Sequence, residues 1–333
     1  MPSRIVTEFV EIGKGILANV AFAGIAAIRE ETHRVLARFH SGLDAPFLTH
    51  RVLLDKPSDA EGYSVDLLSS EIVALLQHRG IGSRYTGRDA IRLALAERRG
   101  PNAEFRLMAK NDSEEDPRII TLDDLMKLVD SGPDGLAQIT NVGVRKNQLR
   151  ERIYLILEKS LQAGKTSHYE FARTSARVRE PSTVDAAYQA NLDLGSIVWA
   201  ENQYFVCIQP SCDALRLSGE TQFIFAFLPE DTQGDSFDVV VRNLEGNDIC
   251  LKLNRKASKI RTVSFDPDDA TGTVSTSIEN GVRKFTSTSG KAFIWICDRR
   301  TSFAQRFVHS IVSNLSRIGL DEFEWQRRRS SSS

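Results

Sequence analysis

The chain of 333 residues is longer than one typical hydrophobic core requires, so two domains are expected. Its hydrophobic content of 41% and charged content of 26% are ordinary for a folded globular protein. The formal net charge of −1 excludes a general electrostatic attraction to nucleic acid or to an anionic membrane, so a nucleic-acid role would need a local basic patch.

The cysteine pattern indicates a reducing, cytoplasmic environment. No CxxC pair and no zinc-type spacing is present, so neither a metal nor another cofactor is expected. Cysteines inside apolar runs are expected to behave as small hydrophobic residues. The four cysteines are Cys207, Cys212, Cys250 and Cys297.

An apolar stretch near the N-terminus covers residues 16–28. It is too short to cross a bilayer. Glu8 and Glu11 precede it, where a signal peptide would carry basic residues. A buried amphipathic helix is therefore expected here, and a membrane partner is not.

Helical spacing dominates the first hundred residues. Apolar side chains recur at helical intervals over residues 5–39, which predicts one long helix or two helices broken at a glycine. Residues 44–62 contain Pro46, Pro57 and Gly62 and are expected to form a loop with one short element. Further helices are predicted over residues 65–77 and 88–98.

The following segment is more polar. Residues 102–118 are rich in acidic side chains, which predicts a surface loop. Thr121 is a candidate N-cap for a helix that continues to about Val129. Helices are also predicted over residues 146–162 and 167–177, and a hinge between two halves is expected over residues 181–193.

From residue 194 the pattern changes to short β-forming runs separated by turn residues. Residues 195–199 and 204–209 predict a hairpin. The even spacing of the runs is typical of a small antiparallel barrel or sandwich. A closing amphipathic helix is predicted over residues 302–318, and further strands over residues 222–228, 237–242, 249–253, 260–265, 281–286 and 291–297.

These patterns predict an α+β fold, in which an N-terminal helical domain precedes an antiparallel β-barrel or sandwich-like domain closed by a C-terminal helix. The expected domains are residues 1–180 and 194–325, with a disordered tail over residues 326–333. The long N-terminal helical pattern also suggests that the chain forms a homo-oligomer.

The main candidate site is the exit of the strand predicted over residues 204–209. Pro210 cannot donate to a β-ladder, so the strand is expected to end there and to present polar groups at its mouth. The favoured interpretation of these groups is structural, in which they cap backbone groups at the end of the strand. The second interpretation is a binding edge, at which Arg216 binds a carboxylate or a phosphate. The candidate binding residues are Gln209, Cys212, Asp213 and Arg216.

Catalysis by Cys212 is an alternative for the same segment. A reactive thiolate needs a base or a positive field, whereas the neighbouring Asp213 would raise the pKa of the thiol. No complete catalytic motif is present in the chain, so no catalytic residue is assigned and an enzyme is the less favoured interpretation. A cysteine-dependent hydrolase stays open.

A second Cys-Asp pair, Cys297-Asp298, also follows an apolar strand-like run. Together with Cys212 and Asp213 it could in principle hold zinc. Such a mixed thiolate and carboxylate set without histidine is unusual, so coincidence is favoured and no metal site is expected.

A basic cluster lies on a helix-turn-helix-like segment, residues 69–99. Arg88, Arg92 and Arg99 fall on or near one helix face, where they could contact phosphates. The balanced net charge favours a solvated face paired with acidic side chains, so nucleic acid is not an expected partner. A DNA-binding regulator stays a further alternative, using Arg79, Arg84, Arg88, Arg92, Arg98 and Arg99.

Three short stretches of the C-terminal half suggest a relationship: Gly195-x-Ile-Val, residues 209–213 together with Arg216, and residues 316–320. Through them this half resembles bacterial response-receiver-associated proteins encoded beside histidine-kinase-like ATPases, in stress or phage-defence loci. The resemblance implies a regulatory or adaptor role and a histidine-kinase-like ATPase as protein partner. The first 60 residues offer no receiver-like strand with an acidic phosphoacceptor cluster, so no phosphoryl-accepting residue is carried over.

The leading hypothesis is therefore a cytoplasmic bacterial regulatory or adaptor protein without enzymatic activity. Its helical half would mediate assembly, and its β-rich half would bind a partner or ligand beside Gln209, Asp213 and Arg216.

Overall fold

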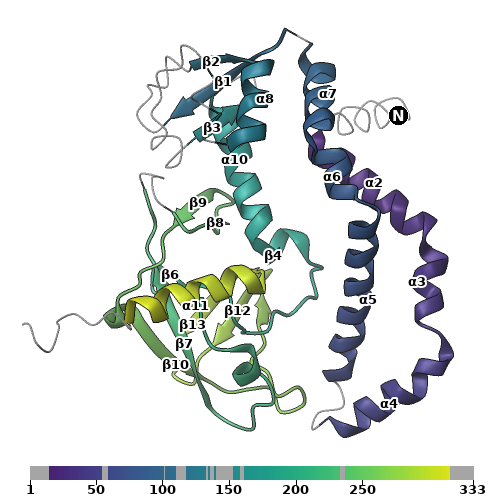
Figure 1. The fold of residues 1–333 in the computed structure, drawn as a ribbon. Helices are drawn as coiled ribbons and strands as arrows, with labels where there is room; N and C mark the ends of the chain where they lie inside the picture. Colours follow the sequence, from purple (N-terminus) through teal and green to yellow (C-terminus); the bar gives the residue numbers. More distant parts are fainter. Residues whose placement is uncertain are drawn as a thin grey trace, which may run out of the picture. The chain divides into compact units, whose positions relative to one another are not determined.

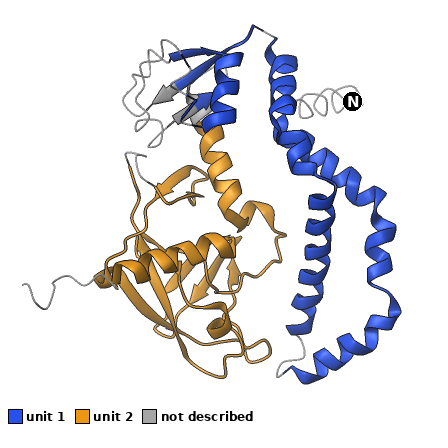
Figure 2. Ribbon diagram, in the orientation of Figure 1, with its two compact units in different colours: residues 1–165 blue, residues 166–333 orange. Residues whose placement is uncertain are grey.

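The computed structural model describes residues 15–54, 59–100, 102–109, 118–132, 134, 135, 139, 153–157, 161–232 and 237–315. The chain forms two compact units, Met1–Lys165 and Thr166–Ser333 (Figure 2). The division falls within the helix α10 (Leu161–Ala176), ahead of the hinge expected over residues 181–193. Helices combine with antiparallel sheets, which confirms the α+β class.

The described helices of the first unit precede its strands in the sequence, apart from α8 (Figure 1). The loop expected over residues 44–62 is wrong in part, because α4 and the start of α5 lie there. Pro46 is tolerated in the first turn of α4, where backbone N–H groups have no helical partner, and Asp44 suits the positive N-terminal end. These helices are α2 (Ile16–Glu30), α3 (Thr32–Arg38), α4 (Asp44–Leu53), α5 (Asp59–His78), α6 (Ile81–Thr86) and α7 (Arg88–Arg99).

Helices α2 to α5 bury few of their side chains. The expectation of a buried helix over residues 16–28 is wrong in that respect, since only Gly24 and Ala27 of α2 are buried. In α5 only Ala60 is buried. Many large apolar side chains of these helices are exposed, including Leu17, Phe22, Ile25, Leu36, Leu48, Val52, Leu53, Tyr63, Val65, Leu67, Leu68 and Val73.

A small antiparallel sheet, ordered β2-β1-β3, forms the core of the first unit with α7 and α8 (Leu122–Ser131). The expected N-cap is confirmed, because Thr121 Oγ1 accepts a hydrogen bond from Asp124 N at 3.2 Å. The strands are β1 (Glu104–Ala109), β2 (Arg118–Thr121) and β3 (Ile153–Ile156), and the core side chains are Leu95, Phe105, Leu107, Ile120, Leu122, Leu125, Met126 and Ile139.

Two sequence predictions fail at this sheet. The loop expected over residues 102–118 contains β1, in which Phe105 and Leu107 alternate with polar residues and are fully buried. The helix expected over residues 146–162 contains β3, whose register places Leu155 opposite Leu107. Pairing with β1 therefore overrides the helical spacing there; residues 110–117, 140–152 and 158–160 lie outside the described residues.

The second unit is built on one large antiparallel sheet, ordered β10-β7-β6-β5-β13-β12-β11, with β4 also paired to β13. The predicted hairpin is confirmed as β5 and β6, and Glu201 and Asn202 in its turn both have positive φ. A two-residue turn with positive φ at both positions has a backbone twist that fits the right-handed twist of the strands it connects. The strands are β4 (Arg177–Arg179), β5 (Ser196–Ala200), β6 (Gln203–Cys207), β7 (Thr221–Leu228), β10 (Ile260–Phe265), β11 (Ser277–Glu279), β12 (Val282–Thr286) and β13 (Ala292–Arg299).

Of the two predicted alternatives, a barrel or a sandwich-like domain, the closed barrel is not formed, because the sheet is open between β10 and β11. Two of the evenly spaced strands, β8 (Val239–Arg242) and β9 (Asp248–Leu251), leave the sheet and pair with each other as a separate hairpin, and Leu251 of β9 also forms an isolated bridge with Glu230. The turn after β12 reaches the edge of β10, where Thr288 N donates to Ser264 O at 3.0 Å.

Both faces of the large sheet are buried. One face carries an aromatic core of Phe205, Phe223, Phe225, Phe265, Phe285, Phe293 and Trp295. The other packs against β8–β9 and the helix α11 (Thr301–Leu315), which crosses the sheet (Figure 1).

The helix α11 lies very close to the turn before β5. Gly195 has φ +90°, and a Cβ there would lie 2.8 Å from Ala304 Cβ, so only glycine fits. The predicted C-terminal helix is thereby confirmed as far as Leu315; the tail over residues 326–333 and the stretch 316–320 lie outside the described residues. Among the described helices, none has the length and apolar character that a membrane span requires.

Candidate functional site

The strand exit lies where the sequence predicted it. β6 ends at Cys207, and after Pro210 the chain enters the 3₁₀ turn η4 (Ser211–Ala214), in which Asp213 N donates to Pro210 O at 2.9 Å. Cys212, Asp213 and Arg216 are exposed and Arg216 has φ +60°, whereas Gln209 is 9% exposed.

The structure brings Cys212 and Asp213 together. Cys212 Sγ donates to Asp213 Oδ1 at 3.2 Å, and this bond is the largest cause of a raised pKa of the Cys212 thiol. Burial raises the pKa of Cys207 to about 12, and it also raises the pKa of Cys250 and Cys297. Cys212, the exposed cysteine, thus has a carboxylate that disfavours its thiolate.

Alkylation measures this effect directly. We expect iodoacetamide to modify Cys212 no faster than a free cysteine at pH 8, with a rate that climbs about tenfold per pH unit below the raised pKa. Asp213→Asn removes the carboxylate and should speed the reaction, as followed by mass spectrometry. A wild-type rate above that of free cysteine would instead favour the hydrolase alternative.

A cleft borders this strand exit. It has a volume of about 260 Å³, and Ala214 and Leu215 of the exit line it beside the turn before β5, the strand β4 and the end of β13. The polar side chains among its lining residues are those of Arg179, Asn191, Asp193, Ser196, Asp298, Arg299 and Thr301. The cleft is therefore lined by both acidic and basic groups.

Asp298 is a largely buried carboxyl group of this cleft. Its Oδ1 accepts hydrogen bonds from Ser196 Oγ and Trp295 Nε1, both at 3.0 Å, and its Oδ2 lies 3.9 Å from Arg179 Nη1. Burial raises the pKa of Asp298, although the two hydrogen bonds oppose the shift. Because the pKa of Asp298 is higher in the folded state, ionisation of Asp298 lowers the free energy of unfolding at pH values above that raised pKa. This loss of stability disappears at pH values below the ordinary aspartate pKa of 3.8.

Two arginines differ in their surroundings. Arg179 has a half-exposed side chain and donates from Nη1 to Tyr188 Oη at 2.7 Å. Arg299 is 4% exposed, and its guanidinium carbon lies 3.9 Å from the centre of the Phe307 ring. Burial lowers the pKa of Arg299 to about 10.

Sequence reasoning did not assign Asp298 to a site, although it singled out the Cys297-Asp298 pair. A register shift in β13 between Trp295 and Cys297 breaks the simple alternation of side chains. Cys297 is buried in the core under α11, while Asp298 lines the cleft. Within the described ranges, no three His, Cys, Asp or Glu side chains are grouped to hold a metal ion.

Three of the six arginines of the DNA-binding alternative are paired with carboxylates. Arg79 pairs with Glu30 and Glu31, Arg88 Nε lies 2.6 Å from Asp130 Oδ2, and Arg92 Nη2 lies 2.9 Å from Asp123 Oδ1. These ion pairs favour the solvated, paired face and give no support to a phosphate-binding face.

No protein-family model, no curated protein and no solved structure matches this chain. The resemblance to response-receiver-associated proteins therefore stays an expectation from the sequence.

Proposed function

We propose that this protein is a regulatory or adaptor protein whose C-terminal unit binds a partner through the cleft beside the strand exit. The observation that carries the proposal is the coincidence of that cleft with the exit: Leu215 lies on its wall, and Asp298 and Arg179 supply opposite charges there.

The chemistry of the cleft suits a polar group of a partner protein. Asp298 Oδ2 is able to accept a hydrogen bond from a cationic or amide donor, and the half-exposed Arg179 is able to hold a carboxylate. Neighbouring Gln209 has a buried Oε1 without a hydrogen-bond partner, so this oxygen is available to accept a hydrogen bond from a partner.

Nothing at the exit favours nucleophilic catalysis. The hydrogen bond from Cys212 to Asp213 holds the thiol in its protonated form, opposite to what a cysteine nucleophile requires. The binding role is thus better supported than the hydrolase role.

Blocking the cleft tests the proposal. Leu215→Arg places a long charged side chain at the wall of the cleft. In a capture experiment with the immobilised full chain and an extract of its source cells, we expect the affinity of this variant for the captured partner to be at least about tenfold lower than that of the wild type. Leu244→Arg is the matched control, because Leu244 is similarly exposed (48% against 42%) but does not line the cleft.

The proposal also predicts a contribution from Asp213, since Asp213→Ala should weaken capture or loosen the turn η4. Equal capture by the Leu215→Arg and Leu244→Arg variants would refute the cleft as the binding site. Cys212-dependent turnover of a hydrolase substrate by the purified protein would refute the non-enzymatic role.

A further inference from the structure

Two segments of the second unit contain none of the 44 acidic residues of the chain. Residues 249–265 carry five lysine or arginine side chains, and residues 299–315 carry three arginines and His309. The first segment runs from β9 through the turn η5 (Ala257–Lys259) into β10, and the second covers the end of β13 and the helix α11. A chain with a formal net charge of −1 therefore gathers positive charge in two places of its second unit.

Contacts of Arg255 hold these two segments side by side. Arg255 Nε donates to Ser310 Oγ of α11, and Asn314 Nδ2 of the same helix donates to the carbonyl oxygen of Arg255 at 2.9 Å. Arg255 Nη2 also donates to Asp238 Oδ1 at 3.2 Å, so this guanidinium has a carboxylate partner. Arg255 thus fixes the basic segment against α11, and the cations beside it determine the charge of the surface.

A groove of about 430 Å³, which we call the α11 groove, lies along this junction, and its lining side chains are all polar. Each of them can donate a hydrogen bond, and none of them is a carboxylate. Such a lining is complementary to an anion rich in acceptor oxygens, such as phosphate. The lining residues are Arg255, His309, Ser310, Ser313 and Asn314.

The exposed face of α11, which crosses the sheet in Figure 1, continues the α11 groove toward the start of the helix. Residues three and four positions apart share one face of a helix, so Arg306 lies on the same face as His309 and Ser313. All three side chains are exposed, and the side of α11 that is buried in the core lies opposite. The outward face of α11 is therefore polar and basic.

The positive charge beside the α11 groove is not compensated by nearby carboxylates. Within the part of the chain that the structure describes, neither Lys256 nor Arg306 forms an ion pair, and both are exposed. The Arg306 guanidinium carbon lies 4.7 Å from the centre of the Phe303 ring, a contact that leaves the charge of Arg306 in place. Both cations are thus available to a bound anion.

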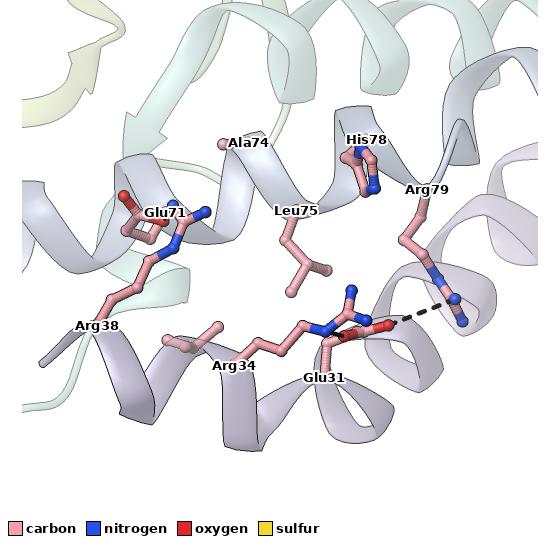
Figure 3. Close-up of a pocket in the computed structure, with 9 residues that line it drawn as sticks. Glu31, Arg34, Arg38, Glu71, Ala74, Leu75, His78 and Arg79 are labelled. Atoms are coloured by element: carbon pink, nitrogen blue, oxygen red, sulfur yellow. Dashed lines mark hydrogen bonds and ion pairs between the residues drawn. The ribbon is translucent and has the colours of Figure 1, made fainter.

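The groove between α3 and α5 in the first unit is the opposite case. It has a volume of about 310 Å³ and is also lined by arginines, which Figure 3 shows beside carboxylates. Arg38 pairs with Glu71, and Arg34 and Arg79 both pair with Glu31. The positive charge of that groove is therefore compensated within the chain, unlike the charge beside the α11 groove.

We propose that the α11 groove and the adjoining face of α11 bind the phosphate backbone of double-stranded nucleic acid. Lys256 and Arg306 contact phosphates as charged groups, and His309 adds a hydrogen-bond donor. The lining of the groove contains no ring except that of His309, so contacts to the backbone dominate over base stacking. An anionic membrane fits less well, because the apolar side of α11 is buried in the core and cannot insert among lipid chains. This inference does not rest on the proposed binding role of the cleft.

Fluorescence anisotropy with the full chain and a labelled DNA duplex of about 20 base pairs tests the proposal. We expect a dissociation constant in the micromolar range at about 50 mM salt. Two charged phosphate contacts predict a slope of about −2 for the logarithm of affinity against the logarithm of salt concentration. The affinity should therefore fall about tenfold between about 50 and 200 mM salt.

Lys256→Gln and Arg306→Gln together remove both charged contacts. The double variant should bind the duplex at least about tenfold more weakly at about 50 mM salt, and its salt slope should approach zero. The matched control combines Gln305→Glu with Lys259→Gln, which lowers the net charge by the same amount and should bind as the wild type does. Gln305 adjoins Arg306 in sequence and so lies on a different side of α11. The Lys259 ammonium lies 5.8 Å from the ring centre of Phe227, which packs on the sheet face opposite α11.

A second variant keeps the test decisive if circular dichroism shows that the double variant is unfolded. His309→Glu places a carboxylate in the lining of the α11 groove and should also weaken duplex binding. Vesicles with about 25% anionic lipid serve as a parallel probe, to which we expect weaker binding.

A wild type that does not bind the duplex at low salt would overturn the proposal, whether an anionic membrane or an acidic protein covers the face instead. Unchanged binding by the folded double variant would overturn it too, since the duplex would then bind elsewhere, for example at residues 69–99. An equal loss in the matched control would show that net charge alone matters, and would refute a specific site at the α11 groove.

Discussion

Phe293→Ala is expected to lower the free energy of unfolding of the C-terminal unit by about 3–5 kcal/mol. Phe293 is 1% exposed, and its ring stacks on Phe225 with centroids 5.7 Å apart and meets Phe265 edge-on at 5.4 Å. The substitution leaves a cavity in the aromatic core between residues of strands β7, β10 and β13. The neighbouring rings are held by two other strands, Phe225 by β7 and Phe265 by β10, and cannot move fully into that space.

Tryptophan fluorescence during urea unfolding measures this loss, since every tryptophan of the sequence lies after residue 166 and so reports on the C-terminal unit. Phe171→Ala is the matched control: Phe171 is 57% exposed on α10, and its variant should change stability by less than about 0.5 kcal/mol. Equal effects of the two variants would show that the aromatic core does not hold this unit together.

Arg173→Ala is expected to lower the free energy of unfolding by about 3–5 kcal/mol, because it removes the most deeply buried cationic partner of two largely buried carboxylates. Arg173 is 5% exposed and joins α10 to two other segments: Nη1 lies 3.0 Å from Asp248 Oδ1 on β9, and Nε lies 4.0 Å from Glu180 Oε2. Glu180 is itself 3% exposed and retains its contact with Arg177 and the hydrogen bond from Ser182 Oγ to its Oε1 at 2.6 Å. The loss therefore reflects unpaired charge more than missing contact area.

Arg242→Ala provides the control for this cluster. Arg242 Nε lies 3.9 Å from the same Asp248 carboxylate but its side chain is 41% exposed, so its removal should cost less than about 1 kcal/mol. Adding Glu180→Gln and Asp248→Asn to Arg173→Ala should recover part of the stability by removing the stranded charges. A triple variant less stable than Arg173→Ala alone would contradict this explanation.

Sequence patterns predicted the second unit better than the first. In β7 and β13 apolar runs bounded by turn residues mark each strand, and the hairpin β5–β6 follows from its short turn. In the first unit, β3 comes from a segment with helical spacing, and only the distant pairing with β1 selects the strand. Barrel closure was also beyond local patterns, because it depends on where β8 and β9 pair.

The candidate site shows the same division between local and distant information. Local residue types placed Pro210 at the end of β6 and put Cys212 next to an unfavourable Asp213, and the structure has both features. The cleft was not predictable, because it forms where β4 and the turn before β5 meet the end of β13, which lies about a hundred residues later in the sequence. The register shift in β13 that frees Asp298 for the cleft has no local sequence signal.

The open sheet has a consequence for the behaviour of the protein at high concentration. A closed barrel has no edges, whereas an open sheet presents two, and exposed edges can recruit strands from other molecules and grow into fibres. At the edge formed by β10, the Thr288 N–H already donates a hydrogen bond to the Ser264 carbonyl oxygen. At the other edge, β11 is only three residues long, and Glu279 of β11 forms an ion pair with Lys284 of β12. Both edges are thus poor templates for aggregation.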